Sequence, residues 1–132
     1  MAHPPPIQGE LQTQLMAVLW RLGSGTVEQA RAALPARYRG AYTTVQTVLN
    51  RLVDRGLLAR AKSGTAYVYR PAISEADYFS RSVEQTLAHA SGGARQAVLA
   101  QLVGSLDAEE VEDLHRLGQE IAASRAKRRR PR

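Results

Sequence analysis

The chain has 132 residues, a formal net charge of +6 and no cysteine. That length allows one domain, or two small ones, with a buried core. The absence of cysteine excludes a disulfide framework and a thiolate metal site, and charged or glycine residues interrupt every long apolar run. The first residues have neither the basic end nor the apolar middle of a secretory signal, so the sequence predicts a soluble, cytoplasmic protein without membrane insertion.

Charge is divided unevenly along the chain. Residues 1–72 carry a net charge of +6, residues 73–124 carry −6, and residues 125–132 carry +6. A basic first part favours a polyanion partner, whereas an acidic second part would be repelled by DNA and needs another role. We therefore expect two functional parts followed by a basic tail.

The first third of the sequence contains two predicted helices. Residues 1–8 are rich in proline and are expected to form a disordered leader. In Glu10–Leu22 the apolar residues recur at helical spacing, and the single tryptophan, Trp20, is expected to pack in the core or at a domain junction. Thr26–Gln29 has the spacing of a capping box, which predicts that a second helix begins there, and Pro35 ends that helix.

Residues 41–56 have the pattern of an amphipathic helix that ends at Gly56. Its apolar face is expected in the core and consists of Val45, Val48, Leu49, Leu52 and Val53. Its polar face consists of Thr43, Gln46, Thr47, Asn50, Arg51 and Asp54. Such hydroxyls, amides and guanidinium groups can read base edges in a major groove, and a solvated helix face is the alternative. In the preceding loop, Arg37 and Arg39 either meet phosphates or are merely solvated. The order of elements predicts a helix-turn-helix.

A change of period after Gly56 predicts a β-hairpin. Leu57–Ala61 and Ala66–Arg70 are strand-like runs, and Lys62–Thr65 separates them as a basic tip. The helix predicted at 41–56 is the candidate reader helix. A hairpin directly after such a helix is a wing, which on DNA lies along the backbone or in an adjoining minor groove. We expect the basic side chains to contact phosphates and the two tyrosines to pack the wing onto the helices; stacking of the tyrosines on bases is the alternative. The residues concerned are Arg60, Lys62 and Arg70, and Tyr67 and Tyr69.

Residues 73–123 are expected to form three short helices. Ser74 is a plausible N-cap for the first, and Asp107–Glu110 forms another capping box at the start of the third. Their apolar stripes consist of Tyr78, Phe79, Val83, Leu87, Val98, Leu102, Val111, Leu114, Leu117 and Ile121. Because three such helices are too small to make a core alone, we expect the stripes to close against a second copy; packing onto the first domain of a monomer is the alternative.

Residues 124–132 have little apolar content and are expected to form a disordered basic tail. Such a tail adds salt-sensitive, non-specific DNA affinity, pairs with the acidic half, or only increases solubility.

Three signatures between Gly9 and Pro71 resemble the penicillinase-repressor family of winged-helix proteins, the BlaI and MecI type. The first is Val18-Leu19-Trp20 at the end of the early helix. The second is the reader pattern Tyr42-Thr43-Thr44-Val45-x-Thr47-x-Leu49-x-Arg51-Leu52-x-x-x-Gly56. The third is Tyr67-x-Tyr69-x-Pro71 in the wing.

This resemblance implies a mainly α-helical protein with a small β-hairpin. A winged helix-turn-helix DNA-binding domain at 9–72 would precede a helical dimerisation domain at 73–123. The implied function is a bacterial, nucleoid-associated homodimeric repressor that binds a palindromic, inverted-repeat operator on double-stranded DNA. The family's reader contacts fall on Tyr42, Thr43, Thr44, Gln46, Thr47 and Arg51. Sequence choice is expected at Gln46, and Arg51 reads a base or acts only as a phosphate clamp.

In the antibiotic-responsive branch of the family, repression is relieved by proteolytic cutting of the dimerisation half, triggered by a membrane-bound sensor metalloprotease. Such a protease, and a role in antibiotic resistance, are therefore implied here too. The chain departs from the family at this point, because the Asn-Phe junction is missing and the only phenylalanine, Phe79, follows Tyr78. The cysteine cluster of the copper-responsive branch is also missing, which disfavours copper sensing.

Enzymatic activity is not expected, and neither is a metal or cofactor. The three histidines, His3, His89 and His115, are scattered, and no serine has a nucleophile-elbow pattern. Two alternatives to a specific repressor remain. One is a non-specific basic protein that binds RNA or has an architectural role on DNA, and the other is a protein-interaction module that has lost DNA binding.

Overall fold

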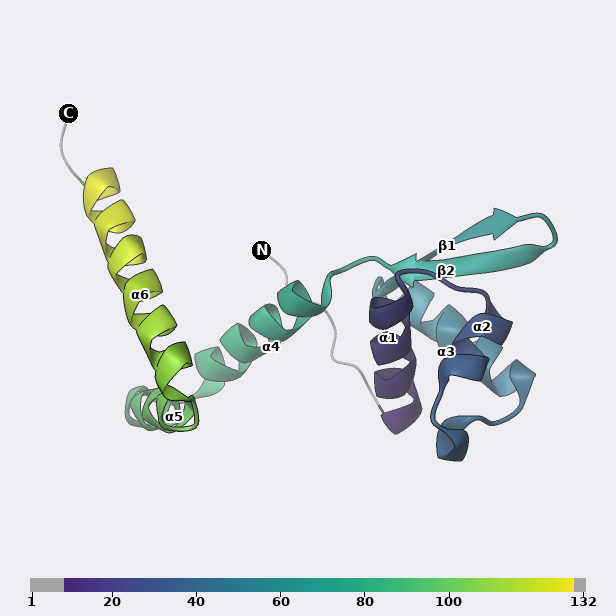
Figure 1. Ribbon diagram of the computed structural model, residues 1–132, viewed down its shortest axis with the longest axis horizontal. Coiled ribbons are helices and arrows are strands. Elements are labelled where there is room, and N and C mark those ends of the chain that lie inside the picture. Colours follow the sequence, from purple (N-terminus) through teal and green to yellow (C-terminus); the bar gives the residue numbers. More distant parts are fainter. Residues whose placement is uncertain (1–8, 130–132) are drawn as a thin grey trace. The chain divides into compact units, whose positions relative to one another are not determined.

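The computed structural model describes residues 9–129 (Figure 1). The chain divides into two compact units, Met1–Ala88 and His89–Arg132. This division differs from the predicted boundary after residue 72, because the helix that follows the wing packs its first turn onto the first unit. The predicted roles of the two domains remain predictions at this point.

The first unit is a winged helix-turn-helix, so the predicted fold is confirmed. Its helices are α1 (Glu10–Leu22), α2 (Val27–Ala33) and α3 (Tyr42–Asp54), with a short 3₁₀ turn η1 (Ala36–Tyr38) before α3. The strands β1 (Leu58–Ser63) and β2 (Ala66–Pro71) form the wing, and α4 (Glu75–His89) follows. The capping box at Thr26 is present: its hydroxyl accepts from the Gln29 amide at 3.2 Å, and the Gln29 side chain accepts from the Thr26 amide at 2.9 Å.

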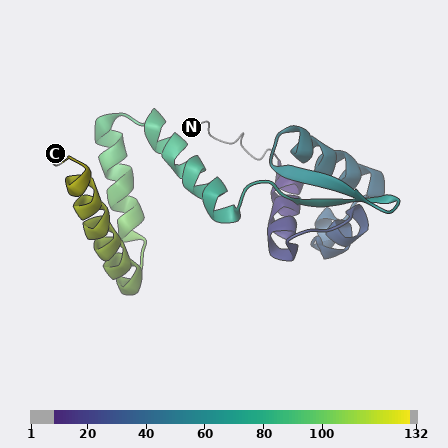
Figure 2. The same ribbon diagram turned by 90° about the horizontal axis from the view of Figure 1, so that it is seen from above.

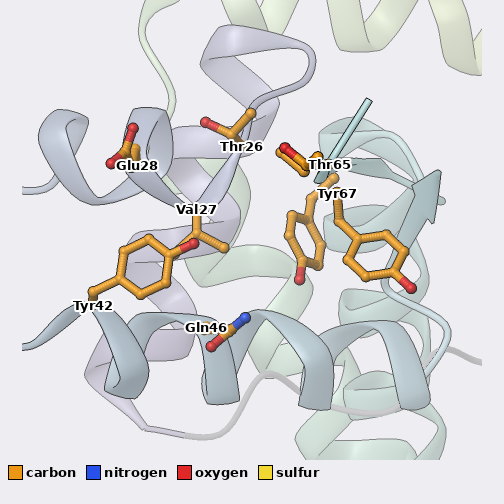
Figure 3. Close-up of a pocket in the computed structure, with 9 residues that line it drawn as sticks. Thr26, Val27, Glu28, Tyr42, Gln46, Thr65 and Tyr67 are labelled. Atoms are coloured by element: carbon orange, nitrogen blue, oxygen red, sulfur yellow. The ribbon is translucent and has the colours of Figure 1, made fainter. Parts of the chain in front are cut away.

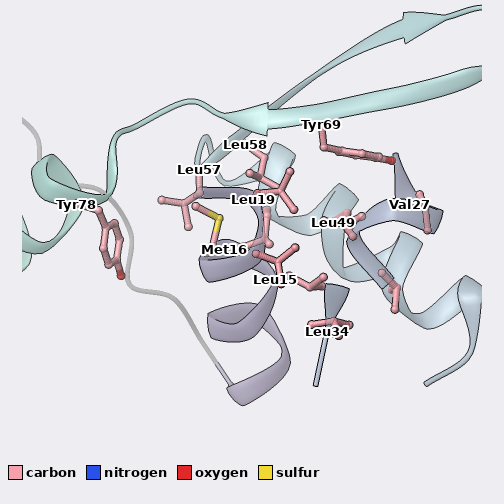
Figure 4. Packing of buried hydrophobic residues seen from close by; sticks show 14 residues of the cluster. Leu15, Met16, Leu19, Val27, Leu34, Leu49, Leu57, Leu58, Tyr69 and Tyr78 are labelled. Carbon is pink, nitrogen blue, oxygen red and sulfur yellow. The ribbon is translucent and has the colours of Figure 1, made fainter. Parts of the chain in front are cut away.

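The core of this unit lies where α1, α2, α3 and the base of the wing meet (Figure 4). The fully or almost fully buried side chains include Leu15, Met16, Leu19, Leu34, Val45, Leu49, Leu52, Leu57 and Tyr69. The apolar face predicted for α3 therefore lies inward. On α1 the helical spacing predicts a stripe from Leu11 to Leu22 with Met16 at its edge. The buried face differs slightly from this stripe, since Met16 is buried and Leu22 is 45% exposed.

The wing is an antiparallel hairpin that is longer than predicted. Its strands pair from Leu58 with Pro71 to Ser63 with Ala66, so that Lys62 lies within β1 and not in the turn. The turn is only Gly64-Thr65, and Gly64 has φ +65°, a left-handed conformation that glycine adopts without steric cost. The backbones of Gly25 and Tyr69 exchange two hydrogen bonds, of 2.9 and 2.8 Å, which attach the wing to the loop between α1 and α2.

Helix α4 begins at the predicted cap, where the Ser74 hydroxyl accepts from the Asp77 amide at 3.1 Å. Its first turn packs on α1: the Trp20 indole N–H donates to the Ile73 carbonyl at 2.9 Å, and the Trp20 ring lies 5.8 Å from the rings of both Tyr78 and Phe79. Tyr78 is only 6% exposed. The structure therefore corrects its assignment to a self-association stripe, because the ring is covered by its own winged-helix unit.

The second unit contains the helical hairpin of α5 (Gly92–Gly104) and α6 (Ala108–Arg129), joined by a short turn (Figure 2). The predicted capping box is present, with the Glu110 amide donating to the Asp107 carboxylate at 2.8 Å and the Asp107 amide donating to Glu110 at 3.1 Å. None of the described residues of α5 and α6 is buried.

Helix α6 contradicts the disordered tail that was predicted from residue 124. It continues through Arg129, because alanine, arginine and lysine are strong helix formers. Its acidic first turn and basic last turn also complement the helix dipole. The expected leader, residues 1–8, and the last residues of the tail, 130–132, lie outside the described residues. Between residues 9 and 129, no helix combines the length and apolar character that a membrane span requires.

Candidate nucleic-acid interface

Helix α3 presents a polar face to solvent. Val45, Leu49 and Leu52 are fully buried beneath it, so the orientation of the helix is fixed by the core. The residues on the outer face are exposed at Tyr42, Thr43, Thr44, Thr47 and Arg51 and half-buried at Gln46 and Asn50. Among the described residues, the guanidinium of Arg51 makes no hydrogen bond or ion pair, so its donors are available to an external acceptor.

The start of α3 is suited to an anion. Its N-cap is Ala41, which has no side-chain oxygen to cap the first amides. The Thr44 amide donates to the Ala41 carbonyl at 3.1 Å. The amides before it lie at the positive end of the helix, where phosphate groups bind in many proteins. Thr43 and Thr44 add two exposed hydroxyls at the same place. The Thr47 hydroxyl instead donates to the Thr43 carbonyl at 2.8 Å, so its proton is already used within the helix.

Asn50 links the reader helix to the wing. Its side-chain oxygen accepts from the Tyr69 hydroxyl at 2.8 Å and from the Arg60 guanidinium at 2.6 Å. Because this oxygen is already occupied, Asn50 is not free to make the bidentate contact to adenine that requires both its oxygen and its amide. The structure thus gives Asn50 a positioning role that the sequence did not indicate.

Three basic side chains of the wing are exposed: Arg60 and Lys62 on β1, and Arg70 on β2. The Arg60 guanidinium lies over the Tyr67 ring, with its carbon 4.5 Å from the ring centre, and it also donates a hydrogen bond to the Asn50 side-chain oxygen. This contact holds one positive charge between the wing and the reader helix. Tyr69 is fully buried, as predicted for packing, whereas Tyr67 remains 41% exposed and supports Arg60.

The two arginines before α3 are engaged elsewhere. The Arg39 guanidinium donates to the carbonyls of Ala32 and Leu34, at 3.2 and 2.8 Å, and so satisfies acceptors at the end of α2. The Arg37 side chain hydrogen-bonds the Tyr38 hydroxyl and lies 3.8 Å from the Glu10 carboxylate. Arg39 therefore stabilises the end of α2, and Arg37 has partners within the chain. Both side chains are exposed, and contact of either one with phosphate stays a prediction.

A groove of about 410 Å³ lies between the start of α2, the reader helix and the wing (Figure 3). Tyr42 and Gln46 border it from α3, Glu28 borders it from α2, and Tyr67 borders it from the wing. Thr26 and Thr65 also line this groove, and the sequence analysis assigned neither of them, nor Glu28, to the DNA-binding face. Only the folded wing brings these separate segments together.

The residues predicted for self-association are exposed, apart from Tyr78 and the half-buried Leu87. The exposed fractions lie between 36% and 52% for Phe79, Val83, Val98, Leu102, Val111, Leu114, Leu117 and Ile121. Within the described residues, no group of three or more histidine, aspartate or glutamate side chains is placed to hold a metal ion.

Comparison with known proteins identifies the family. The model of the family described as penicillinase repressor matches residues 8–120. The chain belongs to the penicillinase repressor family. The transcriptional regulator BlaI of Mycobacterium tuberculosis is 35% identical over 122 residues, which cover 91% of this chain and 88% of that protein. The penicillinase repressor of Bacillus licheniformis is 26% identical over 117 residues, which cover 87% of this chain and 91% of that protein.

A solved structure of the DNA-binding domain of the repressor BlaI is 30% identical, with a TM-score of 0.50, and covers 58% of this chain and 94% of that one. Penicillinase repressors are DNA-binding transcriptional repressors and not enzymes. The family assignment made from the reader and wing signatures is therefore confirmed, as is the expectation that the protein is not an enzyme.

Proposed function

We propose that this penicillinase repressor acts as a homodimer that binds an inverted-repeat operator on double-stranded DNA and blocks transcription in the bacterial cytoplasm. The observation that carries the proposal is the outer face of α3, where Thr43, Thr44 and Arg51 stand exposed and an uncapped helix start lies beside them. The reader helix would enter the major groove, and its start would bind a phosphate.

The chemistry of this face supports a division of roles. Arg51 can donate two parallel hydrogen bonds to a guanine edge, and Gln46 can bond adenine or another base. Each good bidentate contact contributes about 1–3 kcal/mol of discrimination against a wrong base. Lys62, Arg60 and Arg70 are exposed charges on the wing and would contact phosphates, which fix the position of the protein without reading sequence.

The apolar stripes of the second unit support self-association. Neither α5 nor α6 buries a single described residue, and Leu102, Leu114, Leu117 and Ile121 are 45% to 51% exposed. Two such helices cannot be stable in water with these surfaces uncovered. A two-fold dimer would cover them and would place two reader helices about 34–36 Å apart, or a multiple of that, which requires an inverted repeat.

We also propose that proteolysis through a membrane-bound sensor metalloprotease relieves repression. Family membership supports this step, and the chain offers no Asn-Phe junction for it. The Tyr78-Phe79 bond lies inside α4, with Tyr78 buried, so cutting there would require local unfolding of that helix. Immunoblots of cells treated with a β-lactam would show a shortened chain; a chain that stays intact while transcription is induced would overturn this step.

The test of the DNA-binding proposal is selection from a pool of random duplexes at about 150 mM salt, followed by sequencing. We expect one inverted repeat to be enriched, and Arg51→Ala to lose preference at one position of each half-site. Arg81→Ala, which removes an equal charge from α4, is the matched control and should leave the enriched sequence unchanged. Uniform recovery of unrelated sequences would instead favour a non-specific nucleic-acid-binding protein.

A further inference from the structure

Helix α6 has an uneven distribution of charge along its length. Residues 107–113, which include its cap, contain five carboxylates and no basic side chain. Residues 125–129 contain four basic side chains and no carboxylate. The helix therefore has a strongly acidic start and a strongly basic end, and these charged side chains are exposed in the structure apart from the half-buried Asp113.

The apolar stripe of α6 connects these two ends. Leu114, Leu117 and Ile121 follow one another at helical spacing and are 45%, 48% and 51% exposed. By the same spacing, Glu110 extends this face toward the start of the helix and Arg125 extends it toward the end. A partner that covers the stripe must therefore meet a carboxylate at one end and guanidinium groups at the other.

Gly118 lies at the middle of α6 and on the same face as Leu114 and Ile121. A Cβ atom placed there would meet nothing within 4 Å in the single chain, so no contact within the chain requires a glycine. Glycine is less favourable than alanine inside a helix, and one physical reason to tolerate it is the close approach of another backbone. The glycine thus marks a place where a second helix can cross.

We propose that α6 pairs with α6 of a second copy in antiparallel orientation, with the crossing near Gly118. This arrangement rests on the homodimer proposed above and adds its geometry. Antiparallel pairing brings the acidic start of each helix to the basic end of its partner and opposes the two helix dipoles favourably. Parallel pairing would bring acid against acid and base against base at the two ends.

The orientation can be measured with spin labels, because the 132-residue chain has no cysteine of its own. Glu109→Cys and Lys127→Cys place labels near the two ends, on the face turned away from the apolar stripe. Each site is nine residues from Gly118, so in an antiparallel dimer equal labels are about 27 Å apart along the helix axis, from a rise of 1.5 Å per residue.

Three samples are compared by pulsed electron resonance: Glu109→Cys, Lys127→Cys, and dimers reconstituted from a one-to-one mixture of both. The antiparallel dimer predicts that the mixture contains a distance shorter than either variant gives alone. A mixed distance longer than both would overturn the orientation and leave the homodimer intact. No intermolecular distance in any sample, with a monomer by sedimentation, would overturn the homodimer itself.

The role of charge has a separate test in Arg125→Glu/Arg128→Glu. In the antiparallel dimer these changes place acid against acid, so the dimer dissociation constant at low salt should rise at least tenfold, and the difference should shrink in high salt. Arg51→Glu/Arg70→Glu changes the net charge equally within the winged-helix unit and should leave the dissociation constant near that of the unmodified chain. An equal effect of both double variants would show that net charge alone matters and would overturn the complementary pairing.

Discussion

Asn50 is the residue whose role changes most between sequence and structure. On the helical pattern it belongs to the face that reads DNA, yet its oxygen accepts hydrogen bonds from Tyr69 and Arg60 on the wing. The Tyr69 hydroxyl is delivered there by a strand that begins sixteen residues later in the chain. No local pattern could predict this link, because it depends on how the hairpin folds back onto α3.

Asn50→Ala should therefore mainly lower the stability of the fold, and not the preference for particular bases. It leaves the part-buried Tyr69 hydroxyl without its acceptor, and the free energy of unfolding should fall by about 1–2 kcal/mol in chemical denaturation. Operator affinity should fall as well, because the wing is less well fixed. Tyr69→Phe is the matched partner: if the two changes act through one bond, the double variant should be less destabilised than the sum. Relaxed preference at one base, with unchanged stability, would restore Asn50 as a reader.

Lys62 offers the contrasting case of a charge without a partner among the described residues. It lies on β1 opposite Tyr67 and is exposed. If it neutralises one phosphate, Lys62→Ala should weaken binding similarly on all duplexes and reduce the slope of log affinity against log salt by about 1. Fluorescence anisotropy over a salt series measures this slope. Lys62→Arg keeps the charge and should keep the slope; a loss confined to one sequence would contradict a phosphate role.

At the level of elements, most of the first unit follows from the sequence. Helical spacing and the capping box at Thr26 predict α1, α2 and α3 because their apolar faces and caps are local properties. Strand ends are less local: β1 extends to Ser63 because Lys62 and Ser63 find pairing partners across the turn. The end of α6 was predicted incorrectly because low apolar content was taken for disorder, although alanine and arginine favour a helix.

The connection between α2 and α3 provides a test at this level. Arg39 donates to two carbonyls at the end of α2, and Arg31 donates to the Gly40 carbonyl at 2.7 Å, so both arginines hold the connection in place. Arg39→Ala should lower the free energy of unfolding by about 1 kcal/mol, because it removes charge-assisted hydrogen bonds to helix-end carbonyls. Thermal unfolding measures this change. The salt dependence of DNA binding should not change; a slope reduced by about 1, with normal stability, would return Arg39 to phosphate binding.

At the level of the whole molecule, the charge division along the sequence indicates the two parts of the protein more clearly than the helical patterns do. The basic first part contains the winged helix. The acidic part contains α5 and most of α6, and none of the described residues of these two helices is buried. The sequence does not show where one compact unit ends, because Trp20 reaches across fifty-three positions to the Ile73 carbonyl. This contact attaches the start of α4 to the winged helix, so the domain boundary predicted after residue 72 falls within the first compact unit.

The proposed dimer makes operator recognition depend on residues far from DNA. Leu114→Asp places a charge on the exposed apolar stripe of α6, which a second copy would have to bury, and it should shift the protein to monomers in analytical ultracentrifugation. Binding to a single half-site should be unchanged, because no residue of the winged helix is altered. Binding to the full inverted repeat should fall by about 10²–10⁴-fold, because the second half-site is no longer bound within the same complex.

Gln119→Asp is the matched control, since it adds the same charge to the same helix on the face away from the stripe. It should keep both the dimer and the affinity for the full repeat. If Leu114→Asp remained dimeric, the stripe of α6 would not be the interface. If it became monomeric and still bound the full repeat as tightly as before, each winged helix would recognise its half-site independently, and dimerisation would add nothing to specificity.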